Sequence, residues 1–379
     1  MHVASPASVI ASTLESLRPE LRTLSLAIHD NPELALQEHQ ACARLTEYLA
    51  SKGFEVTKNV ASLSTAFKAT YTSPYKQGDT DSGLNLGFCS EYDALPGIGH
   101  GCGHNLIAIS GVALFLALVA VMKECRLFGS VTLFGTPAEE AEGGKILMHE
   151  KGVFAGMDLL MMLHPAAGFS GTWRSQCLIE MQVEYFGLSS HAAMAPWEGV
   201  NAGSAAIIAM QTLGVLREQL KPGWLTHGVI THAGEAPNVI PAYSRIAYTV
   251  RTGVAADLKV LRERVLRVFA SAAMATGCTH RVVEEAAYLD NLDNPVLGAL
   301  YEDIMQETYP DETPVRGLGG STDFGNLSHE FVSLHAMFDL DGSRDFIYFK
   351  SKLEAYMSRA HRDPECYEKA YEIIESKKA

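Results

Sequence analysis

A small set of cysteine, histidine and glutamate residues holds the most evident chemical capacity of this chain. Cys102 and His104 lie two residues apart between glycines, Glu139 and Glu140 are adjacent, and His164 follows. Thiolate, imidazole and carboxylate are the groups that hold a zinc-like ion. A second carboxylate beside such an ion can move a proton. The spacing therefore predicts a metal-dependent hydrolase.

The elements that must position these residues belong to an α/β domain. Buried strands are expected at 84–89, 130–135 and 159–163, just before Asp93, the glutamate pair and His164. Open α/β sheets place their sites at the carboxyl ends of strands. Apolar residues at helical spacing predict flanking helices over 7–28, 40–52, 106–123 and 294–308. We expect a central mixed sheet covered by these helices.

The pattern changes near residue 175, which indicates a second domain. An alternating strand is expected at 178–186, further strands at 228–230 and 246–251, and helices at 200–220 and 256–276. Candidate metal ligands are few in this region. We therefore predict a smaller α+β domain at 176–286, inserted into a catalytic domain formed by 1–175 and 287–379.

Composition narrows the functional classes. The 379 residues suffice for two domains, and the net charge of −14 argues against a nucleic-acid partner. Seven scattered cysteines and the lack of a signal-peptide pattern at the start predict a reducing, cytoplasmic location. The apolar run at 106–122 is slightly short for a membrane span, so we expect a buried helix and no membrane partner.

Each candidate residue has a plainer interpretation when it is taken alone. The loop around Cys102 and His104 could hold only a buried thiol and a solvent-facing imidazole. Glu139 and Glu140 could be a solvated acidic patch. Asp93 could be a turn residue, although we favour a role in orienting a metal ligand. Their recurrence after successive predicted strands favours one shared site.

Five other polar residues are structural by default. We expect His100 to be a loop residue rather than a ligand, and His29 to organise the fold. A lone histidine such as His191 is usually structural, Asn238 fits a turn, and Arg251 fits a surface charge at a strand end.

Several motifs in one order resemble the two-domain metallo-amidohydrolases. That group includes aminoacylases, hippurate hydrolases, auxin–amino-acid conjugate hydrolases and β-alanyl-lysine-type dipeptidases. The resemblance covers nearly the whole chain, and its motifs are 29–33, 91–97, Cys102/His104, 137–140, 143–145, His164-Pro165, 191–193, 196–202, 237–241 and 320–326. Asn105 and the 135–137 run look most like the β-alanyl-lysine-type dipeptidase branch.

The resemblance implies a role for each matching residue. The implied metal ligands are Cys102, His104, Glu140, His164 and His361. The implied catalytic residues are Glu139, as general base, and Asp93 in support. The implied substrate-binding residues are His191, Asn238, Arg251, Thr322 and Asp323. The metal would be a divalent ion, with zinc favoured by the thiolate and manganese or cobalt as alternatives, in one or two copies. A homodimer through the inserted domain is also implied.

The C-terminal part departs from the resemblance. Relatives supply a last histidine ligand from a His-Thr-Pro-like motif, for which His361 is the best match here and His335 a competing one. Residues 201–204 also differ from the usual leucine and aspartate. These differences leave the last ligand, the substrate pocket and the number of metal ions open.

Hydrolysis of a small amide, either a dipeptide or an N-acyl amino acid, is the function that we favour. Two alternatives remain at this point. The same groups could catalyse amide formation or another acyl transfer, because both directions of a reaction use the same catalytic groups. The altered C-terminus also allows a non-catalytic binding protein.

Overall fold

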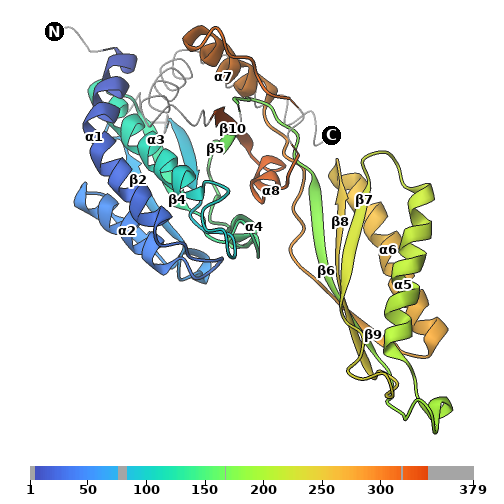
Figure 1. Ribbon diagram of the computed structural model, residues 1–379. Coiled ribbons are helices and arrows are strands. Elements are labelled where there is room, and N and C mark those ends of the chain that lie inside the picture. Colours follow the sequence, from blue (N-terminus) through green and yellow to red (C-terminus); the bar gives the residue numbers. More distant parts are fainter. Residues whose placement is uncertain (1–4, 76–82, 167, 317–318, 340–379) are drawn as a thin grey trace. The chain divides into compact units, whose positions relative to one another are not determined.

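The computed structural model of the protein describes residues 5–75, 83–166, 168–316 and 319–339. The chain divides into two compact units, shown in Figure 1. Unit 1 comprises Met1–Arg174, Asn291–Leu318 and Asp323–Ala379, and unit 2 comprises Ser175–Asp290 and Gly319–Thr322. The sequence places the two main boundaries at 175/176 and 286/287, whereas the structure divides at 174/175 and 290/291 and returns briefly to unit 2 at 319–322.

Unit 1 is built on a six-stranded mixed sheet. In spatial order its strands are β1 (Val56–Lys58), β2 (Phe67–Thr72), β4 (Gly129–Gly135), β3 (Leu84–Ser90), β5 (Leu159–Ala166) and β10 (Val332–Asp339). Strands β4, β3, β5 and β10 run parallel to one another, and β1 and β2 are added antiparallel at one edge. The predicted mixed α/β fold is confirmed.

Helices cover both faces of this sheet because its parallel strands are apolar on both sides. One core contains Met161 and Leu163 of β5 together with apolar residues of α1 (Pro6–His29), α2 (His39–Ser51), α3 (His104–Glu124) and α7 (Pro295–Thr308). The alternate residues Leu160 and Met162 belong to a second core with the short helices α4 (Gly144–Glu150), α8 (Phe324–Ser328) and η1 (Val60–Ser62). The period of two along β5 therefore divides its side chains between two cores.

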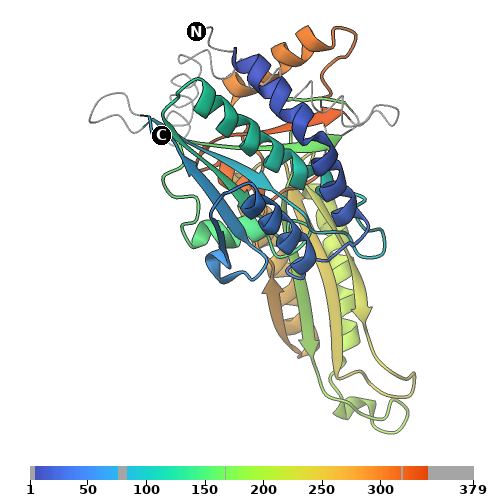
Figure 2. The same cartoon turned by 90° about the vertical axis from the view of Figure 1, so that its left-hand side faces the viewer.

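Helix α3 is the most apolar element of unit 1. By length and composition it could cross a membrane, but 89% of its apolar window is buried inside the protein. It packs against α1 and against strands β3, β4 and β5, as Figures 1 and 2 show. The buried helix expected behind the cysteine–histidine pair is thus present, and it begins at His104 itself.

Unit 2 is a four-stranded antiparallel sheet with two long helices. The strands in spatial order are β7 (Leu225–His232), β8 (Tyr243–Thr252), β6 (Cys177–Phe186) and β9 (Thr279–Glu284). Alternate residues of β6 are buried against α5 (Ala202–Leu216) and α6 (Ala255–Thr276). Two short 3-10 helices, η2 (Pro196–Glu198) and η3 (Arg217–Gln219), complete the unit. The predicted smaller α+β fold is confirmed.

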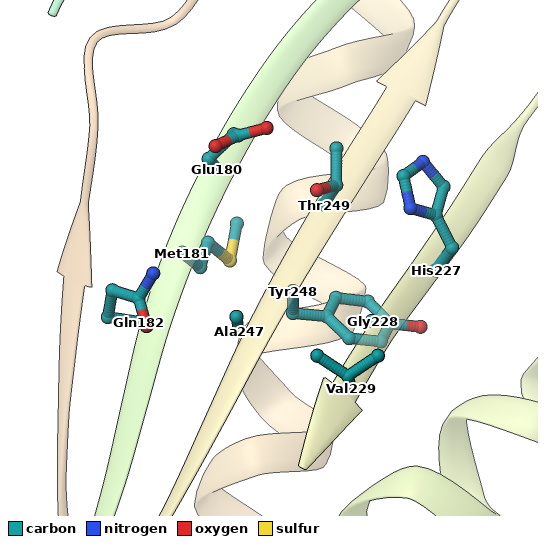
Figure 3. Close-up of a pocket in the computed structure, with 9 residues that line it drawn as sticks. All are labelled: Glu180, Met181, Gln182, His227, Gly228, Val229, Ala247, Tyr248 and Thr249. Atoms are coloured by element: carbon teal, nitrogen blue, oxygen red, sulfur yellow. The ribbon is translucent and has the colours of Figure 1, made fainter. Parts of the chain in front are cut away.

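Three residues of β6, Glu180, Met181 and Gln182, line a pocket on the sheet of unit 2. Its volume is about 400 Å³, and Glu180, Gln182, Thr249 and His227 are among its lining residues (Figure 3). None of the residues predicted to bind metal or substrate lies in it.

The buried carboxylate of Asp293 makes the stability of unit 1 depend on pH. Its oxygens accept hydrogen bonds from the backbone N–H groups of His335 (2.8 Å) and Trp173 (3.4 Å), and burial raises its pKa to about 7. A carboxyl group whose pKa is higher in the folded state stabilises the fold at low pH. That stabilisation is lost as pH rises through the folded pKa.

We therefore expect the difference in free energy of unfolding, Asp293→Asn minus wild type, to increase by on the order of 2 kcal/mol as the pH is raised from 5 to 8. Asparagine keeps an acceptor for the N–H of His335. Urea unfolding of both proteins across this range measures the difference. A difference that is constant with pH would show that Asp293 titrates normally.

Candidate metal centre

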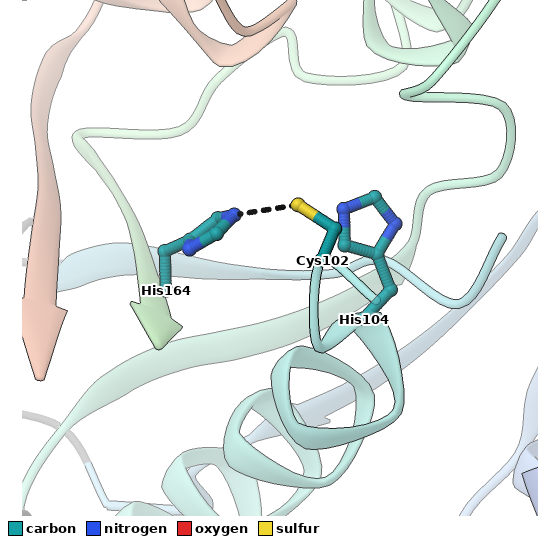
Figure 4. Close-up of side chains that lie close together, drawn as sticks. All are labelled: Cys102, His104 and His164. Atoms are coloured by element: carbon teal, nitrogen blue, oxygen red, sulfur yellow. Dashed lines mark hydrogen bonds between the residues drawn. The ribbon is translucent and has the colours of Figure 1, made fainter. Parts of the chain in front are cut away.

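The loop before α3 and strand β5 bring a cysteine and two histidines together. Sγ of Cys102 lies 3.5 Å from Nε2 of His164, and one ligand atom each of Cys102, His104 and His164 lies within 4.8 Å of the others. Figure 4 shows the three side chains converging from these two segments. The sequence predicts His164 just after a strand, whereas the structure places it inside β5. Cys102 lies in the loop before α3, and His104 is the first residue of that helix.

Gly103 allows this approach. Its φ of +84° lies in the left-handed region that favours glycine, and a Cβ at this position would come within 2.6 Å of Cγ of Pro165. The backbone between Cys102 and His104 can therefore pass directly over the residue after His164. A larger side chain would separate the loop from the strand.

Hydrogen bonds fix the orientation of both candidate ligand histidines. Nδ1 of His104 donates to Oδ1 of Asp93 at 2.8 Å, and Nδ1 of His164 donates to the carbonyl of Pro165 at 2.7 Å. With the proton on Nδ1, each Nε2 presents its lone pair, which is how histidines are held in metal sites. Asp93 therefore orients a candidate ligand, in the way that we favoured from the sequence.

The glutamate pair follows β4 in a tight turn held from two sides. Oε1 of buried Glu38 accepts the N–H of Ala138, whose φ is +61°, and Oδ2 of Asp93 accepts the N–H of Glu140 at 2.8 Å. Both carboxylates face Nε2 of His104: Oε2 of Glu139 lies 3.8 Å from it and Oε1 of Glu140 lies 3.7 Å from it. The sequence alone did not indicate that Glu38 supports this turn.

A buried ion network lies under the same histidine. Nζ of Lys145 contacts Glu91 (2.5 Å) and Asp323 (2.6 Å), and all three side chains are at most 1% exposed. Glu91, His104 and Glu139 form a second group whose ligand atoms lie within 4.8 Å of one another. Glu91 and Lys145 lie in motifs recognised from the sequence, but no role was predicted for either. Glu91, like Glu139, follows shortly after the end of a predicted strand.

The electrostatics of the cluster favour a cation. Burial raises the pKa of Glu139 well above its ordinary value, and the carboxylate of Glu91 adds to this effect. Burial would lower the pKa of His104, but its hydrogen bond to Asp93 and the surrounding carboxylates raise that pKa well above 6.5. The rise in the pKa of His104, which runs against the effect of its burial, indicates negative charge around this ring. A divalent ion would balance that charge.

The separations between these donor atoms suit an ion. Zinc holds nitrogen and oxygen at 2.0–2.2 Å and sulfur at about 2.3 Å, so that tetrahedral ligand atoms lie about 3.3–3.8 Å apart. The distances of 3.5 Å between Sγ of Cys102 and Nε2 of His164, and of 3.7 Å between Nε2 of His104 and Oε1 of Glu140, fall in this range. Nε2 of His104 and Oε1 of Glu140 are buried and have no hydrogen-bond partner among the described residues. The residues present therefore fit a metal ion.

Of the two histidines considered for the last ligand, only His335 lies among the described residues. His335 lies on β10, fully buried, with its ring centre 5.7 Å from that of His164. It packs against Trp173 and Phe324, and it is in neither of the two groups of ligand atoms found among the described residues. His361 lies outside the described residues. His100 lies in the loop before α3, stacks on His29 with ring centres 6.4 Å apart, and is in neither group of ligand atoms.

The predicted substrate-binding residues of unit 2 fall into two sets. His191 and Asn238 are exposed and belong to adjoining loops, because the N–H of Ala192 donates to the carbonyl of Asn238. Arg251, on β8, donates to the hydroxyl of Ser321 at 3.0 Å, and Thr322 is buried.

Asp323 differs from its predicted role. The sequence predicts contact with substrate, but the structure buries this carboxylate completely. Oδ1 accepts from Nζ of Lys145, and Oδ2 accepts from the backbone N–H of the same residue. Direct contact with substrate is inconsistent with this burial, and Asp323 instead pairs with the buried Lys145.

Comparison with known proteins agrees with this architecture. Residues 176–276 match the M20 peptidase dimerisation domain. The chain is 38% identical over 343 residues to an Xaa-Arg dipeptidase of Mus musculus, covering 86% of this chain and 78% of that protein. It is 31% identical over 326 residues to a p-aminobenzoyl-glutamate hydrolase chain of Escherichia coli, covering 80% of this chain and 65% of that one.

Solved structures show the same fold. An aminobenzoyl-glutamate utilization protein of Klebsiella pneumoniae matches with a TM-score of 0.72 at 18% identity, over 91% of this chain and 96% of that one. A dinuclear metal-binding peptidase of the M20 family from Bacillus subtilis matches with a TM-score of 0.65 at 16% identity, over 91% and 98%. Together with the sequence relatives, these matches establish that the chain belongs to the M20 peptidase family.

Proposed function

We propose that this protein is a metal-dependent dipeptidase that hydrolyses the amide bond of small dipeptides, with arginine or another basic residue at the carboxyl end. The observation that carries the proposal is the convergence of Cys102, His104, Glu139, Glu140 and His164 in one cluster of buried and half-buried side chains. The basic residue is suggested by the Xaa-Arg dipeptidases of mouse and human, each 38% identical to this chain.

The proposed ligands are Cys102, His104, Glu140 and His164, with His361 retained as a fifth. A bound divalent ion, for which we favour zinc over manganese or cobalt, would activate water and polarise the amide carbonyl. The thiolate favours zinc, and the number of ions, one or two, is to be decided by metal analysis.

Glu139 is the proposed general base. Its carboxylate accepts a proton from the attacking water and delivers it to the leaving amine nitrogen. Its carboxylate is buried beside Nε2 of His104, so it lies where a water bound near that nitrogen would be within reach of a base. Asp93 orients His104 and the backbone of Glu140, so it assists without touching the substrate.

Residues of unit 2 are proposed to bind the substrate. The N–H groups of Ala193 and Met194 both donate to Nδ1 of His191 at 3.2 Å, which leaves Nε2 to carry the proton. Exposed His191 can therefore donate a hydrogen bond to a carbonyl oxygen or to the oxyanion that forms from it. Asn238 adjoins it, and Arg251 is proposed to bind the substrate carboxylate.

We further propose a homodimer through unit 2 and a cytoplasmic location. The match to the dimerisation domain supports the first. The scattered cysteines, of which the six described are free thiols, support the second.

The proposal is tested by amine release from a panel of substrates, with and without a chelator. The panel contains Xaa-Arg, Xaa-Lys and Xaa-Leu dipeptides, N-acetyl-arginine and p-aminobenzoyl-glutamate. We expect turnover of the Xaa-Arg and Xaa-Lys dipeptides that the chelator abolishes and that added zinc restores. Turnover that is insensitive to the chelator would contradict the metal mechanism, and preference for p-aminobenzoyl-glutamate would contradict the basic substrate.

A further inference from the structure

Glu91 has one carboxylate oxygen engaged and one facing the metal centre. It directly follows β3 and is completely buried. Oε1 accepts a hydrogen bond from Nζ of Lys145, whereas Oε2 has no hydrogen-bond partner among the described residues. That second oxygen lies 3.5 Å from Nε2 of His104.

Lys145 neutralises only part of the negative charge around it. Its ammonium group lies between Glu91 and Asp323, so two carboxylates share one positive charge. An uncompensated buried carboxylate is costly unless a cation or hydrogen bonds satisfy it. If Glu91 served only as a counter-ion for Lys145, Asp323 would already fill that role and Oε2 would remain unsatisfied. Without metal, only a protonated His104 can offset this charge; a ligand histidine gives up that proton when it binds a metal ion, and the ion then takes its place beside Oε2.

The position of Oε2 suits a ligand of the ion bound by His104. Its 3.5 Å separation from Nε2 equals the Cys102–His164 separation, and both match the distance between neighbouring ligand atoms on one zinc ion. Nδ1 of His104 is occupied by Asp93, so Nε2 is the nitrogen available to a metal. Because a single nitrogen binds only one ion, an ion held by Nε2 of His104 would also be the ion nearest to Oε2 of Glu91.

We propose that Glu91 is a metal ligand of this centre, and that Lys145 and Asp323 are positioning residues that hold it. The inference rests on the metal-dependent function proposed above. Lys145 fixes Oε1, and Asp323 fixes Lys145 through both its ammonium and its backbone N–H. Oε2 of Glu91 is thereby held in the direction of the proposed ion. The centre would then have a carboxylate ligand supplied from the end of β3, in addition to those from α3, the β4 turn and β5.

The test compares Glu91→Gln with wild type and with Glu302→Gln. Glutamine keeps an oxygen for Lys145 but removes the anionic ligand. Glu302 pairs with Arg316 in unit 1, outside the metal cluster, and so controls for the loss of a partly buried carboxylate. We measure zinc affinity by competition with a chromophoric chelator, and the visible absorption spectrum of the cobalt-substituted protein.

For Glu91→Gln we expect zinc affinity to fall at least tenfold and the cobalt d–d bands to shift, whereas Glu302→Gln matches wild type. If Glu91→Gln does not fold, Glu91→Asp retains the charge but withdraws the oxygen, and it should show the same two changes. Unchanged affinity and spectrum in the Glu91 variants would overturn the inference alone. A wild-type protein that binds neither zinc nor cobalt would overturn the proposed function as well.

Discussion

Replacing Glu139 with glutamine lowers kcat for dipeptide hydrolysis by about 10²–10⁴-fold, which is the usual contribution of a general base. The amide of glutamine is nearly isosteric with the carboxylate but cannot accept the proton of the attacking water. Glu139 is buried near Nε2 of His104 without being one of the proposed metal ligands. Metal content should therefore stay at the wild-type level.

Two neighbouring glutamates serve as matched controls. Glu140→Gln removes a proposed ligand, so it should reduce both metal content and activity, and added zinc should partly restore activity. Glu142 lies in the same turn but is exposed, and Glu142→Gln should match wild type in both measurements. Initial rates and metal analysis on the three variants separate the roles. A Glu139→Gln enzyme with wild-type kcat would exclude Glu139 as the base.

Replacing Lys145 with methionine lowers the free energy of unfolding of unit 1 by about 3–5 kcal/mol, because breaking a buried ion network leaves uncompensated charge. The ammonium group is fully buried, and the neighbouring carboxylates of Asp323 and Glu91 hold its pKa above the ordinary value against the effect of burial. Without it, two carboxylates would remain buried side by side. Urea unfolding measures the loss, followed by the fluorescence of Trp173 in unit 1 after Trp197 and Trp224 of unit 2 are replaced by phenylalanine in both proteins.

The control for Lys145 is another lysine of unit 1. Lys52 pairs with Glu20 at the surface, and exposed pairs contribute at most about 1 kcal/mol. Lys52→Met should therefore have a small effect. Combining Lys145→Met with Glu91→Gln and Asp323→Asn removes the excess charge and should recover part of the lost stability. A Lys145→Met protein as stable as wild type would show that the carboxylates are protonated or otherwise compensated.

The elements with a strong hydrophobic period follow from sequence with little error. Helices expected at 7–28 and 256–276 are found at Pro6–His29 and Ala255–Thr276, and the strand expected at 159–163 is found at Leu159–Ala166. Strands β2, β9 and β10 were not predicted from the sequence. Strand β9 is only partly buried, and β10, buried on both faces, has no alternation of polar and apolar residues.

The sequence by itself determined the residue types of the metal centre and the strands that deliver them. Thiolate, imidazole and carboxylate side chains at successive strand ends permit few other chemistries. Tertiary structure decided which atoms face each other. Three contacts join residues that are far apart in the chain or in different elements. They are the close approach of Gly103 to Pro165, the short distance from Oε2 of Glu91 to His104, and the buried pair of Asp323 and Lys145. Local patterning cannot specify such contacts, because they depend on how whole strands and helices pack.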